Sequence, residues 1–463
     1  MEILAIFLSL GLLMFFAYRG FSVILFAPVF AVLAGLLSGL PILPTYTEVF
    51  MPKTVVFVKN FFPLFMLGAV LGKVMEATGS AKKIAIMIVH ALGKERAVPA
   101  IIVSCVVLVY GGVSTHVVAF AVYPLAAALF REANYPKRLI PACIGFGSWS
   151  VSMDAMPGTP QIQNLIPTKY FGTTAYAAPV TGIIASILLL AGGIIYMEWR
   201  RKKLVASGEG YGEGHINEPD PKAVDESNLP SGFVAALPLL LVLIGNYVFT
   251  AWIPTWDPSI LKGVTTGVTL QNVTGIWALI VALTIAVVVC VAMNFKRFEK
   301  VGGLGKASQV AILGSLLAIM NTGSEVGYGS VIATLSGFKS ISDFLMSVHI
   351  GNSPLLSEAL MTNVIAGVTG SASGGLGIAM ELMGSTYMAW GQQAGINPEL
   401  LHRIASLASG GMDTLPHNGA VITLLAICGL THRQSYKDIF ALTIWKTTVA
   451  FIMVLIVTFF PIV

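Results

Sequence analysis

Apolar residues occur along the chain in long runs that short polar segments separate. An α-helix needs about 20 residues to cross about 30 Å of hydrocarbon, and ten of the runs are suited to such a crossing. They lie near 3–18, 22–40, 54–78, 136–166, 174–198, 233–254, 272–294, 306–335, 398–430 and 438–461. The pattern predicts an all-α polytopic membrane protein with ten crossings.

Two further apolar segments carry a cluster of small residues at their centre. The sequence "YGGVST" divides the segment 97–130, and "TGSASGG" divides the segment 354–388. Glycine relaxes a helix, and irregular backbone at membrane depth occurs only where protein or a wet cavity surrounds it. We therefore expect each segment to be a re-entrant hairpin rather than a single crossing.

Two of the ten predicted crossings contain residues that interrupt a helix. Pro157 and Pro160 lack an amide proton and flank Gly158, and the second interruption contains Pro416 and Gly419. The backbone should unwind around 151–160 and around 409–419. Broken helices in corresponding halves of a membrane protein are typical of a transporter binding site near the bilayer midplane.

An internal repeat relates the two halves of the chain. "MDAMPGTPQI" resembles "MDTLPHNGAV", which places Asp413 at 413 − 154 = 259 residues after Asp154. The same offset relates "VYGGVS" to "VTGSAS", since 373 − 114 = 259. The predicted units are a membrane half at 1–204, a flexible Gly- and Pro-rich linker at 205–232 and a second half at 233–463. Because five crossings precede the linker, the second half should be inverted.

Composition and charge support this assignment and place the linker. Hydrophobic residues make up 56% of the chain and charged residues 11%, which excludes a soluble globular protein. In the predicted arrangement of crossings, basic residues such as Lys82, Lys137 and Arg200 fall on one side of the membrane. That side should be the cytoplasm, so the linker should be cytoplasmic and both termini external. The N-terminal run lacks a cleavage site and is interpreted as the first crossing. No basic block indicates nucleic acid, and the four cysteines suggest no metal site or disulfide framework.

The hairpin tips and the helix breaks supply the candidate site residues. Half-helix N-termini, hydroxyls and amides there could bind a small anion, and ionisable groups at membrane depth are candidates for ion coupling. The predicted substrate-binding residues are Gly112, Ser114, Thr115, Asp154, Thr159, Gln161, Ser371, Ser373, Gly374 and Asn418. The predicted ion-coupling residues are Asp413, His417, Glu325 and His116. No metal or cofactor is expected.

The second break is the predicted proton site because of a difference between the two repeats. It carries His417 and Asn418 where the first break has Gly158 and Thr159. Asp413 beside His417 is expected to form a pair whose proton affinity changes as the site alternates between water and protein. No cluster of buried Arg or Lys is apparent, so the site should favour one carboxylate with a nearby hydroxyl over di- or tricarboxylates.

Each candidate also has a structural interpretation. Asp154 and Asp413 could cap half-helices, and Gly/Ser clusters could be packing contacts. His116 and His417 could relay a proton or form ordinary hydrogen bonds, and Glu325 could carry a proton or pair across a domain interface. Sodium coupling competes with proton coupling, because hydroxyls and free carbonyls suit a hard cation. A channel is a weaker alternative, and an intramembrane hydrolase lacks the expected motifs.

The residues around the first hairpin and break resemble a known family. "YGGVSTHVVAFAVYPLAAALFREANYPKRLIPACIGFGS" followed by "MPGTPQIQNLIPTKYFGTT" is similar to the gluconate permease family of the ion transporter superfamily, especially its 3-hydroxybutyrate permease-like branch. The resemblance implies a bacterial inner-membrane proton symporter for small hydroxy-carboxylates. It also implies a homodimer with elevator-type motion. The expected partners are thus a small organic acid, a proton or sodium ion, the lipid bilayer and a second copy.

Overall fold

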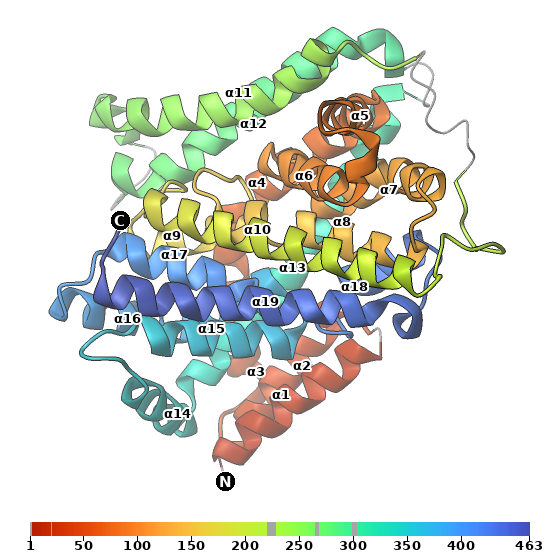
Figure 1. The fold of residues 1–463 in the computed structure, drawn as a ribbon. Coiled ribbons are helices and arrows are strands. Elements are labelled where there is room, and N and C mark those ends of the chain that lie inside the picture. The colour runs from red at the N-terminus through yellow and green to blue at the C-terminus, as the bar shows by residue number, and fades with distance from the viewer. Residues whose placement is uncertain (1, 20, 220–227, 264–267, 299–302) are drawn as a thin grey trace.

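The protein folds as a bundle of helices in a computed structural model. The structure describes residues 2–19, 21–219, 228–263, 268–298 and 303–463 (Figure 1), and these ranges contain no β-strand. The helices of the first half are α1 (Glu2–Tyr18), α2 (Val23–Leu37), α3 (Ile42–Pro44), α4 (Met51–Ala77), α5 (Ser80–Leu92), α6 (Ala97–Tyr110), α7 (Thr115–Glu132), α8 (Ile140–Ser148), α9 (Ile166–Phe171) and α10 (Pro179–Ala206). Those of the second half are α11 (Gly232–Trp252), α12 (Leu270–Phe298), α13 (Gly303–Thr334), α14 (Ser336–Ser347), α15 (Leu355–Thr369), α16 (Ala372–Gln393), α17 (Pro398–Ser409), α18 (Gly419–Ile427) and α19 (His432–Phe459).

The order of elements is similar in the two halves. Each half has two helices, a long helix (α4 or α13), a short amphipathic helix (α5 or α14), a hairpin (α6–α7 or α15–α16), a broken helix and a long closing helix (α10 or α19). In Figure 1, α10 ends at the right, where the linker begins, and α19 ends at the left, beside the C-terminus. The two packed closing helices therefore run in opposite directions, as an inverted duplication would require.

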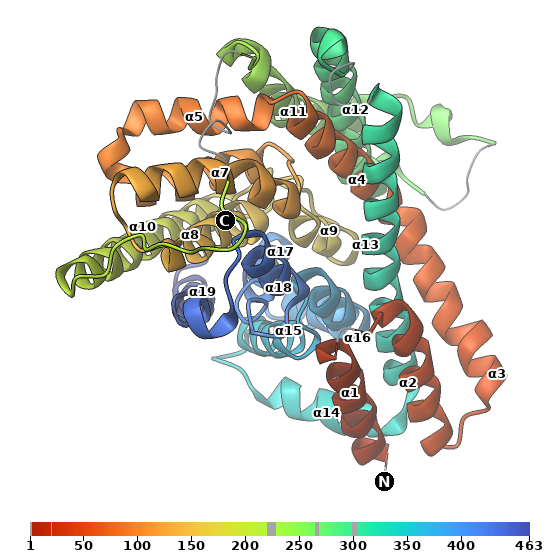
Figure 2. The same ribbon diagram turned by 90° about the vertical axis from the view of Figure 1, so that its right-hand side faces the viewer.

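The helices form two groups that meet along α13. Figure 2 shows α4 and α13 crossing at the right, with α1 and α2 beside α13 and with α11 and α12 above. The hairpins, the broken helices and the closing helices form the second group. Because α13 packs against α4 and α2 on one side and against α16 on the other, it forms the border between the groups.

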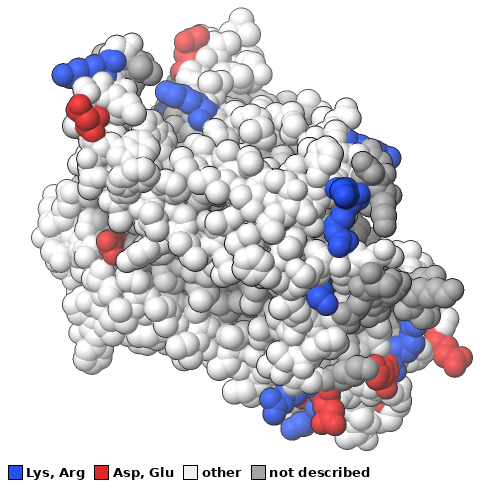
Figure 3. Space-filling model, turned by 90° about the horizontal axis from the view of Figure 1, so that it is seen from above, with Lys and Arg blue, Asp and Glu red and all other residues white. Residues whose placement is uncertain are grey.

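The surface and the helix lengths are those of a multi-pass membrane protein. Within the described residues, six helical segments are long and apolar enough to cross a bilayer: Ile42–Ala77, α10, α11, α12, α13 and α19. Large apolar side chains such as Leu43, Ile187 and Val288 are exposed on them. Charged side chains gather toward two ends of the face in Figure 3 and leave an uncharged expanse between them. The predicted all-α membrane class is confirmed, whereas the count of ten crossings stays a prediction.

Helix–turn–helix pairs and irregular segments occupy the positions of the predicted hairpins and breaks, while the re-entrant character of the hairpins stays a prediction. The α6–α7 and α15–α16 pairs are packed helix–turn–helix units that turn at Gly111–Ser114 and at Gly370–Ser371. After α8, a π-helical turn (Val151–Ala155) leads into irregular backbone, and α9 does not begin until Ile166. The second break spans 410–418, between α17 and α18. The prolines of the two motifs thus lie within the irregular backbone, although α8 and α17 end several residues before the first proline of each motif.

The first part of the linker is more ordered than its composition predicts. Arg138 Nε donates to Glu209 at 2.7 Å, and Lys137 Nζ donates to Glu218 at 3.0 Å. Burial raises the pKa of Glu218, but hydrogen bonds from Tyr211, Lys137 and Arg131 outweigh it and lower the pKa to about 2. Residues 220–227 of the predicted linker lie outside the described part of the chain.

Candidate functional site

The first hairpin tip lies against the first helix break. Tyr110 Oη donates to the Pro157 carbonyl at 2.9 Å, and Gln161 Nε2 donates to the Val109 carbonyl at 2.9 Å. Gly112 has φ +94°, and a Cβ there would lie 3.4 Å from the Pro160 ring. The turn therefore requires a backbone conformation that favours glycine.

The second hairpin tip makes an equivalent contact with the second break. Gly370 has φ +65°, and a Cβ there would lie 2.7 Å from His417 Cδ2, which places the imidazole against the tip. Ser371 accepts the Gly374 N–H at 3.0 Å and so caps α16. Asn418 accepts the Ala420 N–H at 2.6 Å and caps α18. Each hairpin thus supports the break of its own half.

The two breaks also contact each other. A Cβ placed on Gly410, the first residue after α17, would overlap the Asp154 carboxylate. The Asp154 carbonyl accepts a hydrogen bond from Ser406 Oγ at 2.8 Å. Both Asp154 and Gly410 are buried. The first break therefore packs directly on the end of the half-helix that precedes the second.

A buried arginine anchors this contact. Arg403 lies on α17 with 0% exposure, and its Nη2 donates to the Ala177 carbonyl at 2.6 Å. Its Nη1 donates to Asn164 Oδ1 at 2.8 Å. Asn164 in turn donates to the carbonyls of Thr159 and Ala175, at 3.0 and 2.8 Å. The guanidinium thus ties irregular backbone of the first half to α17, and the acceptors that it contacts are uncharged.

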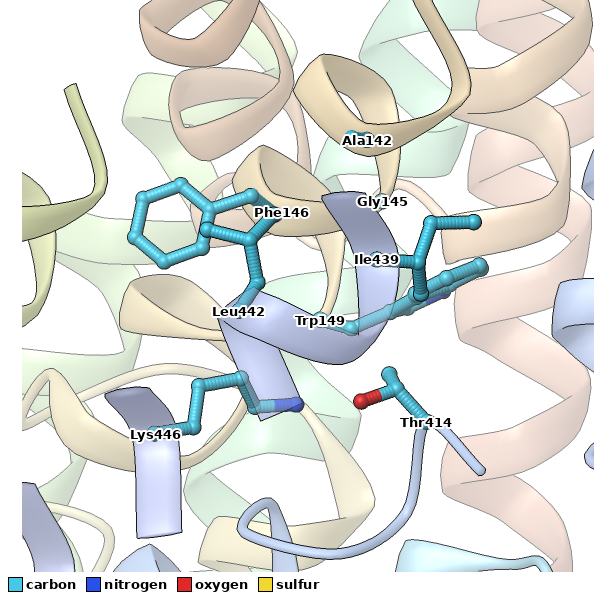
Figure 4. Close-up of a pocket in the computed structure, with 8 residues that line it drawn as sticks. All are labelled: Ala142, Gly145, Phe146, Trp149, Thr414, Ile439, Leu442 and Lys446. Carbon is cyan, nitrogen blue, oxygen red and sulfur yellow. The ribbon is translucent and has the colours of Figure 1, made fainter. Parts of the chain in front are cut away.

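A buried ion pair joins the second break to the closing helix. Lys446 Nζ on α19 lies 2.7 Å from Asp413 Oδ1, and the two side chains are 4% and 5% exposed. Figure 4 shows Lys446 pointing toward Thr414, in a pocket that Trp149 and Phe146 also line. The space in this pocket is enough for about one water molecule. The pocket is therefore a gap beside the ion pair and too small to hold an organic acid.

Among the described residues, four carboxylate, guanidinium or ammonium side chains are consequently buried around the meeting point of the breaks. Two are acidic and two are basic, so their formal charges sum to zero: Asp154, Asp413, Arg403 and Lys446. Charges are costly in a low-dielectric interior unless they are paired or hydrogen-bonded. Such a group can stabilise irregular backbone, and it can also respond to a bound anion or a proton.

Glu325 and the second hairpin tip meet at the border between the helix groups. The Glu325 carboxylate, on α13, would overlap a Cβ placed on Gly374. It is 3% exposed, and its Oε2 has no hydrogen-bond partner in the described part of the structure. Ser373 Oγ lies 3.3 Å from Thr322 Oγ1 on α13. This arrangement places the Glu325 carboxylate beside the second tip, and both its proton-carrying role and its pairing across an interface stay predictions.

Several predicted binding groups are engaged in local structure. Ser371 and Asn418 are helix caps, while Thr159 donates to the Ser152 carbonyl and Gln161 to the first hairpin. Their side chains support the breaks and tips in this structure. Whether they also contact a substrate stays a prediction.

The remaining predicted residues lie at the tips and breaks. Ser114 and Thr115 are partly buried where α7 begins. His116 belongs to α7, but its side chain lies outside the described part of the structure.

Asp413 forms an ion pair with Lys446, because α19 passes the break with its ammonium at hydrogen-bond distance. The expected pair of Asp413 with His417 stays a prediction. The expectation that no cluster of buried Arg or Lys lies here is wrong, since Arg403 and Lys446 are both buried beside the breaks. Sequence analysis missed them and Glu358 of α15. Each stands within or beside an apolar run, the signal that could have marked them as candidates.

The fold and this arrangement define a membrane transporter built on hairpins and broken helices. The chain belongs to the GntP permease family, since the model described as "GntP family permease" matches residues 1–460. It is 47% identical to an uncharacterized transporter of Bacillus subtilis, over 98% of both chains. It is 24% identical to the high-affinity gluconate transporter of Escherichia coli, over 85% of each.

Two solved structures show a related fold. The YdaH transporter of Alcanivorax borkumensis, whose topology is described as unusual, aligns with a TM-score of 0.57 at 15% identity and with 90% coverage of both chains. MtrF of Neisseria gonorrhoeae, described as illuminating a class of antimetabolite efflux pumps, aligns with a TM-score of 0.57 at 12% identity, covering 89% of this chain and 84% of its own. At these identities the likeness concerns the fold alone.

Proposed function

We propose that the protein is a secondary active transporter that imports a small hydroxy-monocarboxylate by proton symport across a bacterial inner membrane. The candidate substrates are 3-hydroxybutyrate, gluconate and acids of similar chemistry. The observation that carries the proposal is the contact between two broken helices through buried charged groups, supported by membership in the GntP permease family. The distant likeness to a gluconate transporter supports the class of substrate.

The preference for a single carboxylate rests on how the buried basic groups are used. Arg403 is engaged by carbonyls and an amide, and Lys446 is paired with Asp413. A monocarboxylate needs only one new set of hydrogen-bond donors. A di- or tricarboxylate would bring additional charge into a region whose basic groups are already engaged.

Proton coupling is assigned to the second break. Asp413 and Lys446 form an ion pair that a proton on the carboxylate would weaken, and His417 lies a few residues away against the second tip. Protonation would release the Lys446 ammonium for an anionic substrate, which couples the two binding events. Sodium remains the competing coupling ion.

An elevator motion in a homodimer is part of the proposal. The hairpins and breaks contact the other helices along α13, where glycine backbones approach closely. A Cβ on Gly329 would lie 3.2 Å from Ile378, and one on Gly377 would lie 2.8 Å from Val326. Small residues permit close helix contact in membranes. The α13–α16 contact is the surface along which the second group of helices would move.

Substrate identity can be tested by counterflow in proteoliposomes. Liposomes loaded with unlabelled acid should accumulate labelled 3-hydroxybutyrate or gluconate transiently, and lactate should compete. Citrate and succinate should not compete at the same concentrations. Competition in the reverse order, or no exchange of any hydroxy-monocarboxylate, would refute the proposed substrate class.

A further inference from the structure

Glu358 is a buried carboxylate outside the contact between the breaks. It lies in the first turn of α15 with 0% exposure. Neither of its carboxylate oxygens has a hydrogen-bond partner among the described residues. On the adjoining hairpin helix α16, the Tyr387 hydroxyl lies 3.0 Å from Ser357 Oγ and is hydrogen-bonded to Ser357. The carboxylate of Glu358 is thus surrounded by protein and bound by none of its described groups.

Thr362 provides a third unpartnered oxygen on the same helix face. It follows Glu358 by four residues, is 0% exposed, and its Oγ1 also lacks a partner in the described ranges. Residues four apart lie next to each other on a helix surface. Buried hydroxyls elsewhere in the protein bond the carbonyl four residues before, as Thr54 does with Phe50 and Ser104 with Ala100, at 3.1 and 2.7 Å. Thr362 does not use this acceptor.

A charged carboxylate cannot remain unpaired in such an environment. Burying an isolated ionised group is far costlier than burying a neutral one, so Glu358 must carry a proton or bind a cation. A proton would satisfy one oxygen. Three unpartnered oxygens with a single negative charge are better matched by a hard monovalent cation, because such ions prefer oxygen ligands and one carboxylate balances one charge.

The helix that carries these oxygens also holds the second break. Asn363, adjacent to Thr362, donates through Nδ2 to the Ala408 carbonyl at 3.0 Å. A Cβ placed on Gly411 would overlap the same amide. Five residues of helix, about 7.5 Å, separate Glu358 from Asn363. An ion bound at Glu358 would therefore fix α15, which positions the backbone at the start of the break.

We propose that Glu358 and Thr362 bind a sodium ion that holds α15 against the second break. The site is separate from the Asp413–Lys446 pair and from the proposed substrate groups. It goes beyond the proposed function, because it requires neither a substrate nor an ion gradient. A failure of one proposal is therefore distinguishable from a failure of the other.

The test is thermal unfolding of the purified full-length protein in equal concentrations of NaCl, KCl and choline chloride. We expect the wild-type Tm to be higher in NaCl than in choline chloride by about 2 °C or more. Glu358→Gln should abolish the difference, and Thr362→Val should reduce it. Glu48→Gln removes an exposed carboxylate, and Thr448→Val removes an exposed hydroxyl, so both should retain the full difference.

Direct binding keeps the proposal testable if Glu358→Gln does not fold. Radiolabelled sodium should bind the wild-type protein and should bind Thr362→Val more weakly. Equal wild-type Tm values in the three salts, or an undiminished sodium effect in Glu358→Gln, would overturn the proposal. Equal Tm values together with a stable Glu358→Gln would instead show that the carboxylate is protonated.

Discussion

Lys446→Met tests the ion pair that joins the second break to α19. In the wild-type protein the Lys446 ammonium lies 2.7 Å from Asp413 Oδ1, and both side chains are 5% exposed or less. The variant leaves Asp413 as a buried carboxylate without this partner. Breaking a buried pair from one side costs about 3–5 kcal/mol, because the remaining charge stays desolvated. Lys446→Met should therefore lower the free energy of unfolding by about that amount. Asp413→Asn should show a smaller loss, since the amide can still accept a hydrogen bond.

The double variant separates stability from coupling. Lys446→Met combined with Asp413→Asn removes both charges, so it should be more stable than Lys446→Met alone. Proton-driven uptake should be lost in both single variants and in the double variant, whereas substrate counterflow should survive in part in Asp413→Asn. The assays are unfolding in detergent and paired uptake and counterflow measurements in proteoliposomes.

A second buried ion pair provides the matched control. Arg200 Nε lies 2.6 Å from Asp438 Oδ1, with side chains 11% and 1% exposed. Asp438→Asn should destabilise the protein and leave the ratio of uptake to counterflow unchanged. The reasoning is refuted if the free energy of unfolding of the double variant falls by the sum of the losses in the two single variants. It is also refuted if Asp438→Asn uncouples transport as strongly as Asp413→Asn.

Three further predictions concern topology, packing and the linker. In intact cells, an impermeant thiol reagent should label Ser259→Cys and should not label Glu213→Cys in the linker. The background should be low because the native cysteines are buried. Labelling of the linker from outside would contradict the predicted topology, in which the second half is inverted and the linker is cytoplasmic. Gly410→Ala should force the first-break carboxylate aside, cost about 1–3 kcal/mol and reduce uptake and counterflow together. A Cβ on Gly419 would meet nothing within 4 Å, so Gly419→Ala should leave uptake and counterflow unchanged. Equal effects of Gly410→Ala and Gly419→Ala would show that the contact between Gly410 and Asp154 is unimportant. Because the pKa of Glu218 is lowered, its ion pairs should stabilise the linker throughout about pH 5–8 and be lost only as the pH falls toward 2. Glu218→Gln should therefore increase the hydrogen exchange of residues 209–218 at neutral pH. Unchanged exchange in this variant would contradict the prediction.

The sequence predicted the elements whose causes are local. Pro157, Pro160 and Pro416 remove amide protons, so the chain itself shows that no regular helix continues through these positions, although α8 and α17 end several residues earlier. The glycines of the hairpin tips likewise mark turns, and the apolar runs mark the helices. The first part of the linker departs from its composition because ion pairs to α7 and to the short turn that precedes α8 hold it, and such contacts have no local signature.

The partners of the buried charges could not be predicted in the same way. Asp413 and His417 are neighbours in sequence, but Lys446 is 33 residues away and reaches Asp413 only because α19 packs along the second break. Arg403 acts on carbonyls of the other half of the chain, such as Ala177. Glu358 was overlooked because its significance lies in the absence of partners among the described residues, which depends on how helices pack around it.

The most direct test of the central claim is concentrative uptake of a labelled hydroxy-monocarboxylate into proteoliposomes under separately imposed gradients. An inward proton gradient should drive 3-hydroxybutyrate or gluconate above its external concentration, and Asp413→Asn and His417→Ala should abolish that accumulation. A sodium gradient alone should not drive it. Accumulation that follows only the sodium gradient, or that persists at the wild-type level in both variants, would contradict proton symport through the second break.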